Sequence, residues 1–169
     1  PSERQRSAFG QAAAQAARAL GCDVDEMALG CVVRLDRGFP AVVTKDALFR
    51  AEFSAHLTKG GDSRVAVGDW VLARVPAGHD MGLILEIFPR ESDIARWRGG
   101  SRGERQTLAA NVSMVLIVQQ LGANVISCER VARSAVIARD CGAEVAVVLT
   151  KADRAPSAVL AEDVAAVRD

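Results

Sequence analysis

The feature that most constrains the fold is a pair of continuous apolar runs in the last third of the chain. Residues 115–118 and 145–149 carry only apolar side chains, and residues 127–140 between them place apolar residues at helical spacing. Such runs are typical of strands buried on both faces of a sheet. A strand, a helix and a second strand in this order predict a parallel sheet. Residues 157–168 predict the start of a further helix, so we expect an α/β domain that is truncated at the C-terminus.

A different pattern precedes this α/β segment. Between residues 29 and 88, short runs with strand-like alternation are separated by turn residues such as Gly68-Asp69. Five short strands within about sixty residues favour a small closed barrel over an open sheet. In front of the barrel, residues 7–20 are rich in alanine and are followed by Gly21, which predicts a surface helix. The same composition faintly resembles a transit peptide, and the glycine stop favours the helix.

The stretch between barrel and α/β segment is basic and rich in glycine. Within residues 90–106, five arginines and three glycines stand beside three acidic residues, which predicts a flexible linker. The chain is therefore divided into a helical extension (1–27), a barrel (28–90), a basic linker (91–106) and the first part of an α/β domain (107–169). The arginines are candidates for contacts to RNA phosphates, and a merely solvated linker is the alternative. They are Arg90, Arg96, Arg98, Arg102 and Arg105.

Charge and cysteine content exclude several classes of function. The chain has 21 basic and 21 acidic side chains, so no overall charge draws it to nucleic acid or to a membrane. Its apolar stretches are too short to cross a bilayer. The four cysteines are scattered without a C-x-x-C pair, which argues against a disulfide framework or a zinc ribbon and favours reducing cytoplasm. No spacing of nucleophiles, bases or metal ligands stands out, so we expect no catalytic residue and no metal ligand in this chain.

The residues that point most clearly to chemistry are Thr150-Lys151-Ala152-Asp153, directly after the second apolar run. In an open α/β sheet, ligands bind beyond the carboxyl ends of the strands. An aspartate there can accept two hydrogen bonds from the N1–H and amino group of guanine, whereas adenine offers no such donor pair. The lysine stem can lie along the purine while its ammonium stays solvated. The alternative is that Asp153 caps the following helix, because K-x-D is common by chance.

A nucleotide enzyme also needs a cradle for phosphates. The pattern G-x-x-x-x-G-K-[ST] does not occur in this sequence: Lys59 precedes its glycines, and the glycines around Ser101 are not followed by Lys and Ser or Thr. In an ordinary small GTPase the phosphate loop comes first and the guanine-reading tetrad much later. Here the tetrad arrives after a single strand–helix–strand unit. Either the tetrad is accidental or the domain is circularly permuted.

Four short motifs, in this order and spacing, resemble the circularly permuted GTPases of bacteria that depend on the small ribosomal subunit. The resemblance runs from about Gly30 to the end of the chain. The motifs are Val-Gly-Asp-Trp-Val at 67–71, Ile-Phe-Pro-Arg at 87–90, Gln-Thr-Leu-Ala-Ala-Asn-Val at 106–112 and Val-Val-Leu-Thr-Lys-Ala-Asp at 147–153.

The resemblance implies an OB-fold-like barrel, then a GTPase domain that begins with the guanine tetrad, then a zinc-binding domain absent from this chain. It implies that the parent is a cytoplasmic, monomeric GTPase of late small-subunit maturation, with GTP and Mg²⁺ bound, ribosomal RNA as its partner and no membrane. Asp153 would read guanine, Lys151 would pack on the base, and Thr150 would support the loop. The chain alone is expected to be inactive without a phosphate loop. The alternative is a non-enzymatic RNA- or ribosome-binding adaptor.

Overall fold

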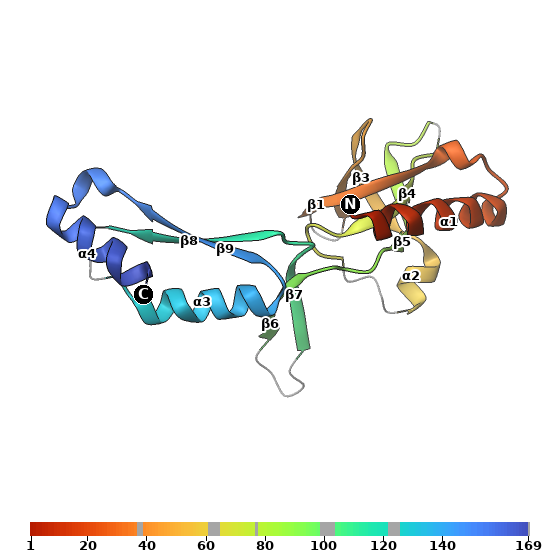
Figure 1. Ribbon diagram of the computed structural model, residues 1–169. Helices are drawn as coiled ribbons and strands as arrows, with labels where there is room; N and C mark the ends of the chain where they lie inside the picture. Colours follow the sequence, from red (N-terminus) through yellow and green to blue (C-terminus); the bar gives the residue numbers. More distant parts are fainter. Residues whose placement is uncertain (37–38, 61–64, 77, 99–103, 122–125, 169) are drawn as a thin grey trace. The chain divides into compact units, whose positions relative to one another are not determined.

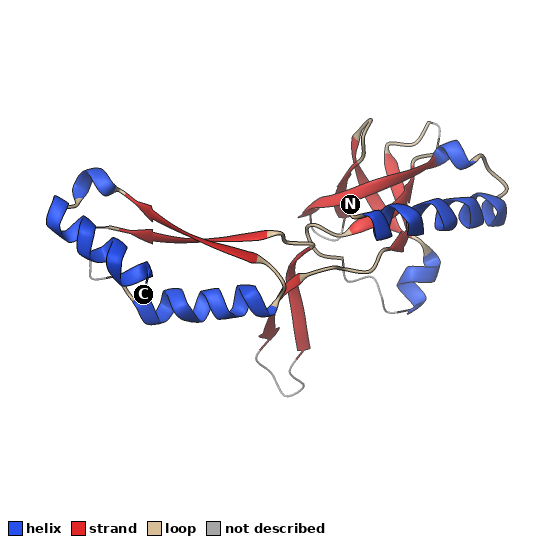
Figure 2. Ribbon diagram, in the orientation of Figure 1, coloured by secondary structure: helices blue, strands red, loops and turns tan. Residues whose placement is uncertain are grey.

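Two compact units make up the chain, residues 1–111 and residues 112–169 (Figure 1). The computed structural model describes residues 1–36, 39–60, 65–76, 78–98, 104–121 and 126–168. Strands dominate the first unit, whereas strands and helices alternate in the second (Figure 2).

The first unit contains the predicted barrel. Its strands close in the order β1-β2-β3-β5-β4, and β4 pairs back onto β1. Only the β3–β5 pairing is parallel among these strands, and a short helix lies between β3 and β4 in the chain. A five-stranded Greek-key barrel of this kind is an OB-like fold. The elements are β1 (Met27–Asp36), β2 (Phe39–Val43), β3 (Leu48–Phe53), α2 (Ala55–Gly60), β4 (Trp70–Arg74) and β5 (Met81–Ile87).

Small β-branched and alanine side chains fill the barrel. Val32, Val42 and Val71 are fully buried at its centre, together with Ala51 and Ile84. Strands β2 and β4 each carry three consecutive buried residues rather than a strict alternation. In β4, Val71 and Ala73 belong to the barrel core, whereas Leu72 lies in a second buried cluster with residues of the N-terminal helix. The prediction of a closed barrel is therefore confirmed.

The N-terminal helix forms as predicted but begins earlier. Helix α1 (Glu3–Leu20) starts at Glu3 rather than residue 7, because the Ser2 hydroxyl and the Gln5 side chain form a capping box. It ends at Gly21, whose φ of 63° suits a glycine cap. The helix is more than a surface element, since Ala13 and Ala17 pack in one core cluster with residues of the barrel. A short turn, η1 (Val24–Glu26), leads into β1.

The prediction of a flexible linker over 91–106 is wrong for the described residues. Strands β6 (Asp93–Arg98) and β7 (Glu104–Ala110) pair as an antiparallel hairpin. The hairpin is joined to the segment that precedes β4, residues 67–69, which we call the barrel turn. The Ala110 N–H donates a hydrogen bond to the Val67 carbonyl oxygen at 2.8 Å. Charged residues that suggested a solvated linker are cross-strand partners instead. The first unit consequently extends to Asn111, beyond the boundary expected at residue 106.

The second unit contains the predicted parallel pair. Strand β8 (Met114–Gln120) pairs in parallel with β9 (Glu144–Thr150), and α3 (Cys128–Asp140) connects them. The 3-10 turn η2 (Ala152–Arg154) and helix α4 (Ser157–Arg168) follow β9. Val131 of α3 packs against Ile117 of β8, and Leu160 of α4 joins the same cluster.

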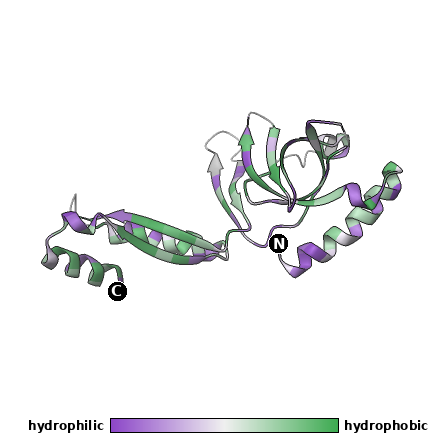
Figure 3. Ribbon diagram, turned by 90° about the horizontal axis from the view of Figure 1, so that it is seen from above, coloured by the Kyte–Doolittle hydropathy of each residue, from purple (hydrophilic) through white to green (hydrophobic). Residues whose placement is uncertain are grey.

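Only one face of this parallel pair is covered, which differs from the expectation of strands buried on both faces. Leu116 and Val118 of β8 are each 58% exposed. The two strands are coloured mainly as hydrophobic in Figure 3. The reason is geometric: the helices of this unit pack on the face that carries Ile117, whereas alternate residues point to the other face.

Candidate functional site

The tetrad predicted to read guanine lies at the carboxyl edge of the parallel pair. Thr150 is the last residue of β9, and it stands directly opposite Gln120, the last residue of β8. Ala152 and Asp153 belong to η2, immediately beyond the strand end. This is the edge at which ligands bind in open α/β sheets. The structure thus gives the tetrad the placement that the sequence predicted.

Thr150 links the tetrad to the neighbouring strand β8 by hydrogen bonds. Its hydroxyl donates to the carbonyl of Gln119 at 3.1 Å, and its own carbonyl accepts a hydrogen bond from Leu121 N at 3.0 Å. These two bonds run in opposite directions between β8 and β9. A threonine at the first tetrad position therefore ties the two strand ends together.

Lys151 adopts a backbone conformation that is unusual for a residue with a Cβ atom. Its φ of 60° and ψ of 38° lie in the left-handed region. Its carbonyl accepts a hydrogen bond from Arg154 N at 3.0 Å, and its ammonium donates to Gln120 Oε1 at 2.7 Å. Backbone strain that is held by surrounding bonds is often found at ligand sites.

Asp153 presents an accessible carboxylate at the same edge. Its side chain is 80% exposed, and Arg154 approaches it only loosely, with 4.0 Å between Nε and Oδ2. An exposed ion pair at that distance contributes little energy, so a ligand can easily replace Arg154 as the partner of the Asp153 carboxylate. The two carboxylate oxygens can accept two adjacent N–H donors of a base.

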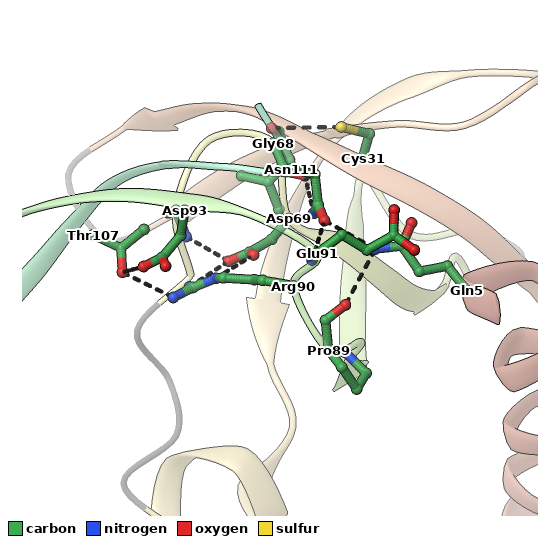
Figure 4. Close-up of polar contacts among 12 residues, drawn as sticks. Gln5, Cys31, Gly68, Asp69, Pro89, Arg90, Glu91, Asp93, Thr107 and Asn111 are labelled. Carbon is green, nitrogen blue, oxygen red and sulfur yellow. Dashed lines mark hydrogen bonds and ion pairs between the residues drawn. The ribbon is translucent and has the colours of Figure 1, made fainter. Parts of the chain in front are cut away.

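Arg90, by contrast, is occupied inside the first unit. Its guanidinium donates to both carboxylate oxygens of Asp69, with distances of 2.7 and 2.8 Å (Figure 4). Asp69 is fully buried and also accepts a hydrogen bond from Ala66 N at 2.7 Å. The hydrogen bond from Arg90 to Asp69 is the main cause that raises the pKa of Arg90. Bidentate Arg–carboxylate pairs of this kind are the strong ones.

The same chain of contacts continues into the hairpin. Arg90 Nη1 donates to the Thr107 hydroxyl at 2.9 Å, and this hydroxyl donates to Asp93 Oδ2 at 3.1 Å. Arg105 holds Asp93 through two bonds of 2.7 and 2.9 Å. The hydrogen bond from Arg105 is the main cause that holds the pKa of Asp93 below its usual range. The contacts thus connect the barrel to both strands of the hairpin.

Asn111 closes the polar network at the end of the first unit (Figure 4). Its side-chain carbonyl accepts hydrogen bonds from Gln5 Nε2 and from Glu91 N, both at 3.0 Å. Its amide donates to the carbonyl of Gly68 at 2.8 Å. Gln5 is itself buried, and its amide also reaches the carbonyl of Pro89 at 3.1 Å. Asn111 therefore binds the helix, the barrel turn and the entry to the hairpin together.

These positions explain three of the four sequence motifs. One network joins residues from the motifs at 67–71, 87–90 and 106–112, which are far apart in sequence. The residues in it are Gly68, Asp69, Pro89, Arg90, Thr107 and Asn111. Sequence reasoning missed the roles of Asp69, Gln5 and Asn111, because neither burial nor pairing is visible in a linear pattern. Asp69 and Asn111 belong to two of the sequence motifs, which were the available signal for them, whereas Gln5 lies outside every motif.

Two of the remaining candidates for RNA contact, Arg96 and Arg98, lie on the hairpin. Arg96 is exposed on β6, with Nε at 3.2 Å from Gln106 Oε1. Arg98 is the last residue of β6, and Arg102 lies outside the described residues. Of the five arginines, Arg90 and Arg105 hold carboxylates of their own chain, whereas the Arg96 side chain is exposed.

The described residues contain no donor set that fits Mg²⁺ or Zn²⁺. Within the ranges that the structure describes, no three side chains of His, Cys, Asp or Glu gather closely enough to hold an ion. The cysteines are free thiols, and burial is the main cause that raises the pKa of Cys31. Among the described helices, none has the length and apolar character needed to span a membrane.

Comparison with known proteins confirms the resemblance that the motifs indicated. No family model matches the chain. It is 38% identical over 137 residues to the small ribosomal subunit biogenesis GTPase RsgA of Streptomyces avermitilis, which covers 80% of this chain and 36% of that protein. It is 30% identical over 124 residues to RsgA of Leptospira interrogans, covering 73% of this chain and 34% of that protein. The chain therefore spans about a third of the length of these curated relatives.

Solved structures show the same fold. The circularly permuted GTPase YloQ aligns with a TM-score of 0.64 at 18% identity, covering 83% of this chain and 46% of that one. YjeQ from Thermotoga maritima aligns with a TM-score of 0.64 at 18% identity, covering 80% and 45%. A barrel followed by a parallel strand pair with helices is thus shared with circularly permuted GTPases.

Proposed function

We propose that this chain, a relative of the RsgA GTPases of small-subunit biogenesis, reads the guanine base of GTP and contacts the small ribosomal subunit in the cytoplasm. The observation that carries the proposal is the placement of residues 150–153 at the carboxyl edge of β8 and β9. The relatives support it, because their names describe GTPases of small ribosomal subunit biogenesis.

The base is recognised by Asp153 and Lys151. The Asp153 carboxylate accepts hydrogen bonds from the N1–H and the 2-amino group of guanine, and adenine has no matching donor pair. The Lys151 stem packs along the purine. Thr150 keeps this loop attached to β8 through its bond to the Gln119 carbonyl.

Hydrolysis depends on groups that the tetrad does not provide. Phosphoryl transfer needs a phosphate cradle and Mg²⁺, which stabilises the developing charge when bound. The 169-residue sequence contains no phosphate-loop pattern, and its described residues offer no fitting metal site. The proposed contribution of this chain is therefore base recognition and docking rather than bond cleavage. The exposed apolar face of β8, with Leu116 and Val118, is suited to packing against more of an α/β domain.

A site that reads the base without a phosphate cradle predicts how the isolated chain behaves. We expect no measurable GTP hydrolysis by residues 1–169, and at most millimolar affinity for guanine nucleotides, because phosphates and their magnesium contribute much of the binding energy. Calorimetric titration with GTP and a phosphate-release assay measure both quantities. Micromolar affinity for GTP would contradict the expectation directly.

The activity itself is tested on the gene product that carries this sequence. Small ribosomal subunits are expected to stimulate its GTP hydrolysis, as measured by phosphate release with and without purified subunits. Subunit binding without any stimulated hydrolysis would instead favour the non-enzymatic adaptor.

The hairpin arginines are proposed to bind phosphates of ribosomal RNA. Arg96 and Arg98 lie on β6, and Arg102 belongs to the same basic stretch. Replacing Arg96 and Arg98 by alanine is expected to weaken small-subunit binding and to flatten its salt dependence by about one unit of slope per arginine. The measurement is the affinity of the chain for small subunits as a function of salt concentration.

Arg133→Ala with Arg139→Ala is the matched control, because both residues are exposed on α3 and carry the same charge. The control is expected to leave the slope unchanged. If the hairpin variant also keeps its slope and affinity, its arginines are merely solvated and other faces of the barrel must bind the subunit.

A further inference from the structure

We propose that Gln120 is a positioning residue of the guanine site: its side-chain carbonyl holds the Lys151 ammonium and thereby sets where the Lys151 stem lies against the base. The inference rests on the proposed function, in which residues 150–153 read guanine. Gln120 lies outside that tetrad, 31 residues earlier in the chain.

The parallel register brings the two residues together. Gln120 is the last residue of β8 and stands opposite Thr150, the last residue of β9. Lys151 follows immediately, and its Nζ lies 2.7 Å from Gln120 Oε1. Both side chains are exposed, so their contact lies at the open edge of the strand pair. A ligand can therefore reach this contact without any opening of the core.

Hydrogen bonds already hold the backbone around Lys151, so the Lys151 side chain is the part that can still change conformation. The carbonyl of Thr150 accepts a bond from Leu121 N, and the carbonyl of Lys151 accepts one from Arg154 N. The left-handed conformation at Lys151 is unfavourable for a residue with a Cβ, so these bonds maintain it. A lysine side chain loses considerable rotamer freedom when it is ordered by a ligand. The bond to Gln120 orders it in advance and so reduces that loss.

A carboxamide suits this task better than a carboxylate. Its neutral carbonyl accepts a hydrogen bond from the ammonium without cancelling the positive charge of Lys151. An acidic residue at position 120 would hold Lys151 as an ion pair and would offset the positive charge of its ammonium.

The test is a titration of the 169-residue chain with guanosine 5′-monophosphate, followed by NMR. Gln120→Leu removes the acceptor and leaves a slightly shorter, apolar side chain. It is expected to weaken binding about three- to tenfold, which is the effect of one net hydrogen bond. The preference for guanosine over xanthosine monophosphate is expected to stay unchanged, because Asp153 sets it.

Gln119→Leu is the matched control, since the Gln119 group that binds Thr150 is its backbone carbonyl. This control is expected to bind like the wild type. In a Lys151→Met background, Gln120→Leu is expected to have no further effect, because Gln120 acts through Lys151. A simple loss of fold would instead lower the affinity in both backgrounds.

The possible results distinguish a failure of the Gln120 role from a failure of the proposed guanine recognition. Wild-type binding with a guanine preference, together with equal affinity of Gln120→Leu, overturns the positioning role and leaves the proposed function intact. Tighter binding by Gln120→Leu overturns it as well, because Gln120 would then hold Lys151 away from the base. Absence of any guanine preference in the wild type overturns both.

Discussion

Replacing Arg90 with alanine is expected to lower the free energy of unfolding of the first unit by about 3–5 kcal/mol. The variant would leave the fully buried Asp69 carboxylate without its bidentate partner, and only the Ala66 N–H among its described hydrogen bonds would still compensate its charge. Removing one member of a buried pair costs far more than the pair itself contributes, because an uncompensated charge remains. Urea denaturation followed by circular dichroism measures the change.

Two variants control this experiment. Arg34→Ala breaks an exposed pair with Asp36 and is expected to cost less than about 1 kcal/mol. Adding Asp69→Asn to Arg90→Ala removes the uncompensated charge and is expected to recover part of the stability. A loss below about 1 kcal/mol for Arg90→Ala alone would show that Asp69 is not held in a buried site.

Replacing Asp153 with asparagine is expected to reverse the base preference of the site from guanine towards xanthine. The carboxylate accepts from the two adjacent donors of guanine, whereas an asparagine amide donates to the O2 atom that xanthine has in place of the amino group. A paired set of base contacts provides discrimination of about 1–3 kcal/mol, so we expect a change of about five- to 150-fold in the affinity ratio. NMR titrations with guanosine and xanthosine monophosphates measure this ratio.

Glu162→Gln on α4 removes the same charge elsewhere in the second unit and is expected to leave the ratio unchanged. An unchanged ratio in Asp153→Asn as well would remove Asp153 from base recognition. The tetrad would then be a strand end and helix start without a nucleotide role.

Much of the second unit was predictable because its signals are local. Continuous apolar runs at 115–118 and 145–149 with a helical stretch between them specify parallel strands, since a crossover helix allows little else. The position of Asp153 beyond the strand end follows from the same pattern. Burial was harder to predict: Leu116 and Val118 are exposed, because coverage of a strand depends on which other elements pack on it.

The hairpin shows why the remaining part was not predictable. Residues 91–106 have the glycine and arginine content of a linker, yet most described residues in this range lie in β6 and β7. The pairing of Asp93 with Arg105 and Thr107 exists only once the strands are side by side. Charge in a linear pattern indicates solvent, whereas charge opposite its partner stabilises an antiparallel pair.

The barrel, the strand–helix–strand unit and the placement of the tetrad follow from the amino-acid pattern, because alternation, apolar runs and turn residues act over short distances. The burial of Asp69 against Arg90, the joining of three segments by Asn111 and the contact of Gln120 with Lys151 arise only in the folded chain. Each of these contacts joins residues at least 20 positions apart in the chain. Their partners are selected by strand register and burial, which no local pattern encodes.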